Sequence, residues 1–137
     1  MIEIQSKKQG AELTSIKLDG KEKLHQGIDF WQRHAPVLFP IVGQIKDGKT
    51  LINGKEYFMS QHGFARDMDF EEIEKMDNIH KYLLKSNEET LKKFPFKFEF
   101  YITYEIEKNT LKVKYEVINK DKTQMLFGLG RTSCFSM

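Results

Sequence analysis

The sequence has little of what several classes of protein depend on. It carries one cysteine, Cys134, in 137 residues, which excludes an internal disulfide framework and a zinc site built from cysteines. A reducing, cytoplasmic location is therefore expected. No apolar run approaches the roughly 20 residues that a membrane helix requires, so no membrane partner is expected. The first residues also lack the apolar segment of a secretory signal.

Charge of one sign and metal-ligand spacing are missing as well. Lysines and arginines number 22 against 20 acidic residues, and without a basic block no nucleic-acid partner is expected. His80 is expected in an exposed turn between two strands, and the histidines show no ligand spacing, so we expect no metal. No glycine-rich phosphate loop leads into a helix, and no serine or cysteine nucleophile signature occurs, so we expect no cofactor.

Strict alternation of apolar and polar residues dominates the second half of the chain. Apolar side chains occupy every second position from Phe94 to Ile106, a pattern that predicts a long, half-buried strand. Lys108-Asn109 is a turn signal, and alternation over residues 111–117 predicts the return strand of a hairpin. A further strand is expected from residue 124 to residue 129.

Shorter elements are predicted from turn chemistry. Asp19-Gly20 predicts an N-terminal hairpin, Asn53-Gly54 separates strands at 50–52 and 56–59, and Asp77-Asn78 separates strands at 70–75 and 79–85. The one expected helix covers residues 86–93, with Ser86 or Asn87 as its cap. Two prolines and a glycine exclude a helix in residues 31–44, which are expected to form an irregular buried segment or a bulged strand.

Successive strands joined by short turns, each with one apolar face, form an antiparallel sheet that needs a second sheet packed against it. The fold class predicted from periodicity is therefore all-β, an antiparallel β-sandwich. The chain shows no linker, repeat or low-complexity segment, so residues 1–137 are expected to form a single domain.

The stretch from Gln61 to Asp67 gathers an imidazole, a guanidinium and a carboxylate within seven residues. A neutral His62 imidazole beside the Arg66 guanidinium can hydrogen-bond two hydroxyls of a polyol. Alternatively, Arg66 and Asp67 pair with neighbours at the start of a strand while His62 caps a turn. Spacing alone favours this structural interpretation, since most isolated polar clusters are structural.

Trp31 is a second candidate. It stands beside a proline-containing irregular segment, and an aromatic face matches the C–H face of a pyranose sugar. Burial in the core is the alternative role for this side chain, and the sequence leaves both open.

Three ordered motifs, at residues 31–43 (WQRHAPVLFPIVG), 54–57 (GKEY) and 61–67 (QHGFARD), resemble the aldose 1-epimerase (galactose mutarotase) superfamily, and in particular its LacX-like branch. The resemblance covers about residues 2–130 and implies the N-terminal half of a large, mutarotase-like β-supersandwich. It also implies metal-free interconversion of the α and β anomers of an aldohexose such as galactose or glucose. In that reaction a carboxylate base takes the anomeric hydroxyl proton while a histidine acid protonates the ring oxygen.

The resemblance implies roles for individual residues. His62 matches the first family histidine, which hydrogen-bonds the sugar near the ring oxygen, and is the catalytic candidate. Arg66 and Asp67 complete that motif as sugar-binding candidates, with Trp31 as the aromatic contact. Gln44 stands where many relatives place a sugar-binding arginine; glutamine keeps hydrogen-bonding capacity and loses the charge.

The chain departs from the family near its C-terminus. The family segment Gly-His-Pro-Ala-Phe holds the acid histidine, whereas residues 131–135 read Arg-Thr-Ser-Cys-Phe, with Thr132 in the histidine's place. Codons GGA CAT CCT GCT TTT, read one base out of frame after a C, spell Arg-Thr-Ser-Cys-Phe. We therefore expect an out-of-frame tail over residues 131–137 of a truncated, catalytically incomplete chain. Strands without their partners would expose apolar faces and edges, so self-association is expected.

Three functional hypotheses follow from these observations. The chain is an aldose 1-epimerase-like protein whose family reaction is sugar mutarotation, a carbohydrate-binding module without catalysis, or a structural β-sandwich fragment without a sugar ligand.

Overall fold

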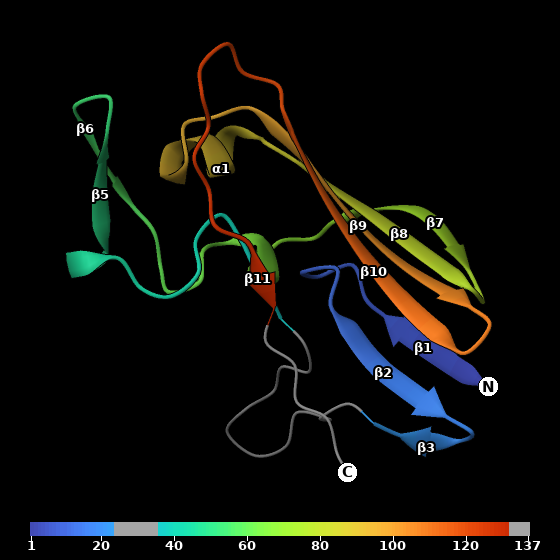
Figure 1. Ribbon diagram of the computed structural model, residues 1–137. Coiled ribbons are helices and arrows are strands. Elements are labelled where there is room, and N and C mark those ends of the chain that lie inside the picture. The colour runs from blue at the N-terminus through green and yellow to red at the C-terminus, as the bar shows by residue number, and fades with distance from the viewer. Residues whose placement is uncertain (24–35, 132–137) are drawn as a thin grey trace.

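The computed structural model describes residues 1–23 and 36–131 (Figure 1). Trp31 and residues 132–137, which include Thr132 and Cys134, lie outside the described residues. The strands are β1 (Ile2–Ser6), β2 (Leu13–Leu18), β3 (Lys21–Glu22), β4 (Val37–Leu38), β5 (Lys49–Ile52), β6 (Lys55–Phe58), β7 (Glu71–Met76), β8 (Ile79–Lys85), β9 (Phe98–Glu107), β10 (Thr110–Asn119) and β11 (Gly130–Arg131). The helix α1 spans Glu88–Lys93, and short 3-10 turns lie at Lys46–Gly48 and Ala65–Asp67.

The largest sheet has the antiparallel order β10-β9-β8-β7. The predicted long hairpin is confirmed: β9 and β10 pair without interruption from Glu107↔Thr110 to Asn119↔Phe98. Phe98, Phe100, Ile102 and Tyr104 are buried on one face of β9, as the alternation predicts. The pattern starts before the strand because the buried Phe94 and Phe96 lie in the turn between α1 and β9.

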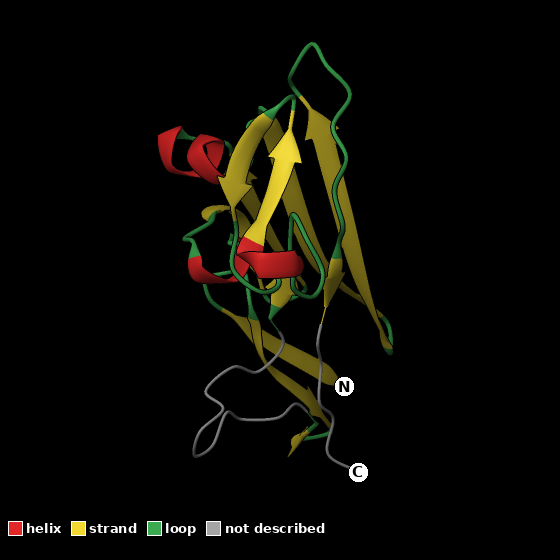
Figure 2. Cartoon of the chain, turned by 90° about the vertical axis from the view of Figure 1, so that its left-hand side faces the viewer, coloured by secondary structure: helices red, strands yellow, loops and turns green. Residues whose placement is uncertain are grey.

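A smaller sheet of order β1-β2-β3 packs on the same core (Figure 2). Ile4 of β1 and Leu13 of β2 share one apolar cluster with the buried side chains of β8 and β9. The Tyr104 hydroxyl donates to the backbone oxygen of Ala11 over 2.7 Å, and burial raises the pKa of this phenol, so it stays protonated as a donor. The antiparallel β-sandwich predicted from periodicity is confirmed.

His80 corrects the sequence-based prediction. It lies within β8, not in an exposed turn, and only 5% of its surface is accessible. Its Nδ1 is 2.6 Å from the Ser6 hydroxyl, which is also 2.6 Å from the Tyr82 hydroxyl. The side chain is buried because a polar partner on β1 satisfies it where the two sheets meet, and periodicity along β8 cannot reveal that partner.

The strand predicted for residues 124–129 is also wrong. This segment is irregular. In the part of the chain that the structure describes, the strand pairing next to it is that of β11 with β4, Gly130↔Leu38 and Arg131↔Val37. Gly128 N–H instead donates to the Pro40 oxygen over 2.6 Å. A single backbone bond of this kind fixes the segment on the residues around Pro40 without building a ladder.

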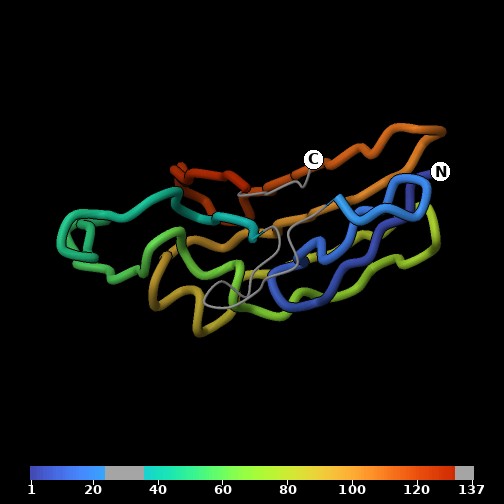
Figure 3. The backbone as a smooth tube through the Cα atoms, turned by 90° about the horizontal axis from the view of Figure 1, so that it is seen from below, coloured from blue at the N-terminus to red at the C-terminus, as the bar shows by residue number. Residues whose placement is uncertain are grey.

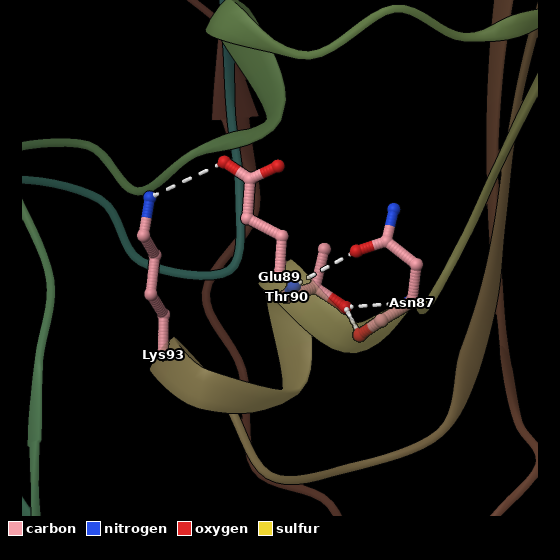
Figure 4. Close-up of polar contacts among 4 residues, drawn as sticks. All are labelled: Asn87, Glu89, Thr90 and Lys93. Atoms are coloured by element: carbon pink, nitrogen blue, oxygen red, sulfur yellow. Dashed lines mark hydrogen bonds and ion pairs between the residues drawn. The ribbon is translucent and has the colours of Figure 1, made fainter.

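The predicted helix is confirmed over Glu88–Lys93, with Asn87 as its cap (Figure 4). Asn87 Oδ1 accepts the Thr90 N–H and Thr90 Oγ1 accepts the Asn87 N–H, each over 2.9 Å. This reciprocal pair satisfies two of the N–H groups that a helix start leaves without intrahelical partners. Ser86, the other candidate, instead accepts the Phe98 N–H at 3.1 Å.

The β5–β6 hairpin projects from one end of the molecule, and the N-terminus lies at the opposite end (Figures 1 and 3). Between them lies the irregular backbone around Phe39 and residues 61–67, beside β11 (Figure 1). Over residues 1–23 and 36–131, no helix has the length and apolar character to span a membrane.

Candidate functional site

Phe39 anchors the motif-bearing backbone in the core. Its side chain is fully buried, and its ring centroid lies 4.5 Å from that of Phe100 and 5.3 Å from that of Phe98. Phe64 of the 61–67 stretch also contacts it, edge to face, at 6.4 Å. Aromatic packing of this kind places the Phe39 carbonyl group at a fixed position.

That carbonyl group organises the turn that follows His62. The Phe39 oxygen accepts the N–H groups of Phe64 and Ala65, at 3.1 and 3.2 Å. Gly63 lies directly against it, with φ +78°, and a Cβ built on Gly63 would be 2.2 Å from the Phe39 oxygen. Only glycine fits here, for both steric and conformational reasons, which explains the residue between His62 and Phe64.

His62 is held by Gly43. The His62 N–H donates to the Gly43 oxygen over 2.7 Å, and the Gly43 N–H donates to His62 Nδ1 over 2.8 Å. An Nδ1 that accepts a hydrogen bond carries no proton, so the imidazole is neutral with its hydrogen on Nε2. Nε2 makes no hydrogen bond to the described residues. The half-buried ring therefore closes a turn, as the structural interpretation predicts, and also keeps one directed N–H donor.

The predicted site residues lie in two neighbouring turns. Gln44 is exposed and directly follows Gly43, so the hydrogen-bonded pair brings it next to His62 despite their separation in sequence. Arg66 lies in the 3-10 turn, where its Nη2 donates to the Gln61 oxygen over 3.0 Å. Asp67 in the same turn is exposed. Trp31 lies outside the described residues.

Sequence reasoning missed Phe39 and Gly43 as the residues that position His62. Two signals were present: a phenylalanine before Pro40 in an otherwise apolar run, and a glycine just beyond that proline. Neither identifies a hydrogen-bond partner many residues away. Only the fold brings residues 39–44 and 61–67 together, through the isolated bridge between Phe39 and Gly63.

A cavity of about 750 Å³ lies elsewhere, between β1 and the β7–β8 turn. Its lining includes Ser6, Lys75 and His80 and none of the predicted site residues. In the described part of the chain no group of three or more histidine, cysteine or acidic side chains is placed to hold a metal ion.

The β-sandwich fold agrees with what comparison with known proteins shows. Residues 2–137 match the model of the family described as "Aldose 1-epimerase". The chain belongs to the aldose 1-epimerase family.

Relatives identified by sequence and by structure are consistent with this family assignment. The plasmid-encoded protein LacX of Lactococcus lactis subsp. lactis is 32% identical over 133 residues, which cover 90% of this chain and 44% of that protein. The crystal structure of a galactose mutarotase related enzyme from Lactobacillus acidophilus superposes with a TM-score of 0.96 at 42% identity, over 100% of this chain and 47% of that one. The crystal structure of a galactose mutarotase-like protein from Lactobacillus casei superposes with a TM-score of 0.90 at 41% identity. This match covers 95% of this chain and 45% of that one. The chain spans less than half the length of these relatives. It resembles the N-terminal half of the family, as the sequence predicts.

Proposed function

We propose that this chain binds an aldohexose, such as galactose or glucose, on the surface formed by the turns at Gln44 and His62. The observation that carries the proposal is the hydrogen-bonded pair between Gly43 and His62. It fixes a neutral imidazole with a single donor at Nε2, and a directed N–H suits the ring oxygen or a hydroxyl of a sugar.

The neighbouring side chains supply complementary groups. The Gln44 amide can both donate and accept, the Arg66 guanidinium donates several hydrogen bonds, and the Asp67 carboxylate accepts. A hexose presents adjacent hydroxyls that both donate and accept, so a mixed set of this kind recognises it better than one charge would. Trp31 is proposed to stack on the sugar ring.

We propose that this chain alone does not catalyse the family reaction, the interconversion of α and β anomers. Mutarotation needs an acid at the ring oxygen and a base at the anomeric hydroxyl acting together. His62 is the one catalytic candidate, and Thr132 stands where the resemblance places the acid histidine; a threonine hydroxyl does not protonate an oxygen near neutral pH. A carbohydrate-binding role without turnover follows.

Three further expectations stay proposals. Residues 1–137 form one domain in the cytoplasm, residues 131–137 are an out-of-frame tail, and the chain associates with itself through exposed strands. Sequencing of the coding region tests the out-of-frame tail. An intact reading frame, with no family-like sequence continuing downstream in a shifted frame, would exclude it.

Two substitutions at His62 separate its structural and ligand-binding roles. Asparagine tolerates a positive φ, which His62 adopts at 65°, and its Oδ1 can replace Nδ1 as the acceptor for Gly43. His62→Asn should therefore fold normally and lose the Nε2–H donor. His62→Gln keeps a donor near Nε2 and loses the acceptor for Gly43.

Titration with galactose and with glucose, followed by Trp31 fluorescence, tests the proposal. We expect saturable binding to the unaltered chain and loss of roughly tenfold in affinity in His62→Asn, the amount typical of one hydrogen bond. Equal affinities of the unaltered chain and His62→Asn would exclude His62 from the site. No saturable signal with either sugar would favour the structural fragment. Polarimetry on fresh α-glucose should show no acceleration; an acceleration would contradict the catalytic part of the proposal alone.

A further inference from the structure

We propose that two copies of this chain pair edge to edge through strand β10, antiparallel and in a single register centred on Tyr115, so that two four-stranded sheets become one continuous sheet. The inference rests on the proposed self-association and names its edge and register. It does not depend on sugar binding.

Strand β10 is an open edge. Within residues 1–23 and 36–131 it is the last strand of the sheet and pairs only with β9, over ten residues without a bulge. The opposite edge strand, β7, differs in kind. It carries Glu71, Glu72 and Glu74, and its register shifts between Glu72 and Glu74. Charge and a bulge are the features by which natural sheets protect an edge. Strand β10 also carries charges, at Lys112, Lys114 and Glu116, but it has no bulge.

The free backbone groups of β10 belong to its odd-numbered residues. Lys120 N–H donates to the Lys97 oxygen over 2.9 Å, and this pair continues the β9–β10 register. Bonds to a partner strand alternate along an antiparallel pair, so even-numbered residues of β10 bond to β9. The N–H and C=O groups of Val113, Tyr115 and Val117 therefore point away from β9, toward the open edge.

The apolar face of β10 is only partly covered: Tyr115 and Val117 are half-buried against the core, and Val113 is exposed. Val113, Tyr115 and Val117 lie opposite Tyr104, Ile102 and Phe100 of β9, on the face that forms the core. The core residues of β9 are fully buried, whereas Val113 is 38% exposed. The apolar face of the sheet thus continues from the buried strand β9 onto the less buried strand β10. Another strand beside β10 would bury more of this face.

Charge pairing points to a second copy as the occupant and discriminates among the four registers that give the longest overlap, which are centred on residues 113 to 116. In a two-fold antiparallel pair centred on Tyr115, Lys114 lies opposite Glu116 of the second copy, and Glu116 opposite the second copy's Lys114. In the same register, Val113 of each copy lies opposite Val117 of the other copy, on the core side of the sheet. A register centred on Lys114 or on Glu116 would place that residue opposite the same residue of the second copy. A register centred on Val113 would place Lys112 opposite Lys114 of the second copy. Of these four registers, only the one centred on Tyr115 contains no pair of like charges.

Sedimentation velocity over a range of concentrations tests the pairing. We expect a dimer for the unaltered chain. Glu116→Lys creates two opposed lysine pairs and should raise the dissociation constant about tenfold or more. The double variant Lys114→Glu/Glu116→Lys restores both opposite-charge pairs and should return the constant to within about twofold of the original. Circular dichroism verifies that each variant keeps its fold.

Mixed cysteine trapping tests the register directly, in a Cys134→Ser background. Val113→Cys and Val117→Cys should form no disulfide dimer separately and should cross-link when mixed under oxidising conditions, because the register opposes these two positions. Leu111→Cys mixed with Val117→Cys is the matched control for the register centred on Lys114, and should not cross-link.

The outcomes are distinct. A monomer at every concentration overturns both the self-association and this inference. Association that is insensitive to Glu116→Lys, or that gives the Leu111–Val117 cross-link, overturns the β10 register and leaves self-association standing. Neither result bears on sugar binding.

Discussion

Gly43 and His62 exchange two hydrogen bonds across the turns that carry them, one from each backbone N–H, over 2.8 and 2.7 Å. Because of this pair, His62 both closes a turn and presents an Nε2–H donor whose direction is fixed by the neighbouring backbone. The two interpretations of the motif that the sequence leaves open are thus compatible, because they use different nitrogens of one ring.

The tautomer of His62 is the first prediction. With Nδ1 accepting from Gly43, the ring should carry its hydrogen on Nε2. Long-range nitrogen–proton NMR correlations distinguish the two tautomers. A protonated Nδ1 would mean that the Gly43 contact is not formed in solution.

Gly63 should be intolerant of any side chain. A Cβ there would lie 2.2 Å from the Phe39 oxygen, so Gly63→Ala must displace the turn from its anchor and should cost about 3 kcal/mol or more in the free energy of unfolding. Gly54→Ala is the matched control, since Gly54 has φ +81° and no atom within 4 Å of a built Cβ. That change should cost only about 1 kcal/mol. Equal losses in urea unfolding would show that the close approach to Phe39 is absent.

The pH dependence of stability should report His80. Burial lowers the pKa of its imidazole below the usual 6.5, and the positive charge of Lys75 acts in the same direction, outweighing Glu72 and Asp77. Between the lowered pKa and about 6.5 the unfolded chain binds more protons than the folded one. The stabilisation is therefore complete above pH about 6.5 and is lost as pH falls through the folded-state pKa.

Urea unfolding at several pH values, compared between the original chain and His80→Asn, isolates this contribution from that of the carboxylates. The original chain should lose more stability on acidification than the variant. Parallel curves for the two proteins would place His80 in solvent, contrary to its contact with Ser6.

The cap of α1 should be worth about 1 kcal/mol. Asn87→Ala removes the acceptor for the Thr90 N–H, and caps of this type typically contribute that amount to stability. Lys92→Ala, exposed within the same helix, serves as the control and should change stability by less than about 0.5 kcal/mol. If both variants unfold at the same denaturant concentration, the reciprocal bonds between Asn87 and Thr90 do not stabilise the helix.

The sequence predicts best where one physical signal repeats. Alternation from Phe98 to Glu107 fixes both the strand and its buried face, and turn pairs such as Asn53-Gly54 locate the hairpins, because each signal is local. Alternation fails where tertiary partners decide. His80 is polar and buried because Ser6 lies opposite it, and residues after Gln124 are irregular because Gly128 bonds to Pro40.

The candidate site shows the same division. The motif around His62 is recognisable in the sequence through its resemblance to a family, and that family is confirmed. What positions the imidazole, the carbonyl group of Phe39 and the backbone of Gly43, depends on a close approach of two irregular segments. No periodicity describes such segments, so spacing within 61–67 cannot show which residue outside the motif will contact it.

The central claim is that a sugar binds beside the Gly43–His62 pair. Amide NMR spectra recorded during titration with galactose test it most directly. The account predicts saturable shifts at Gly43, Gln44 and His62, together with the His62 Nε2–H signal, and little change near Ser6 and His80. Shifts confined to the Ser6–His80 cavity, or none with any aldohexose, would contradict it.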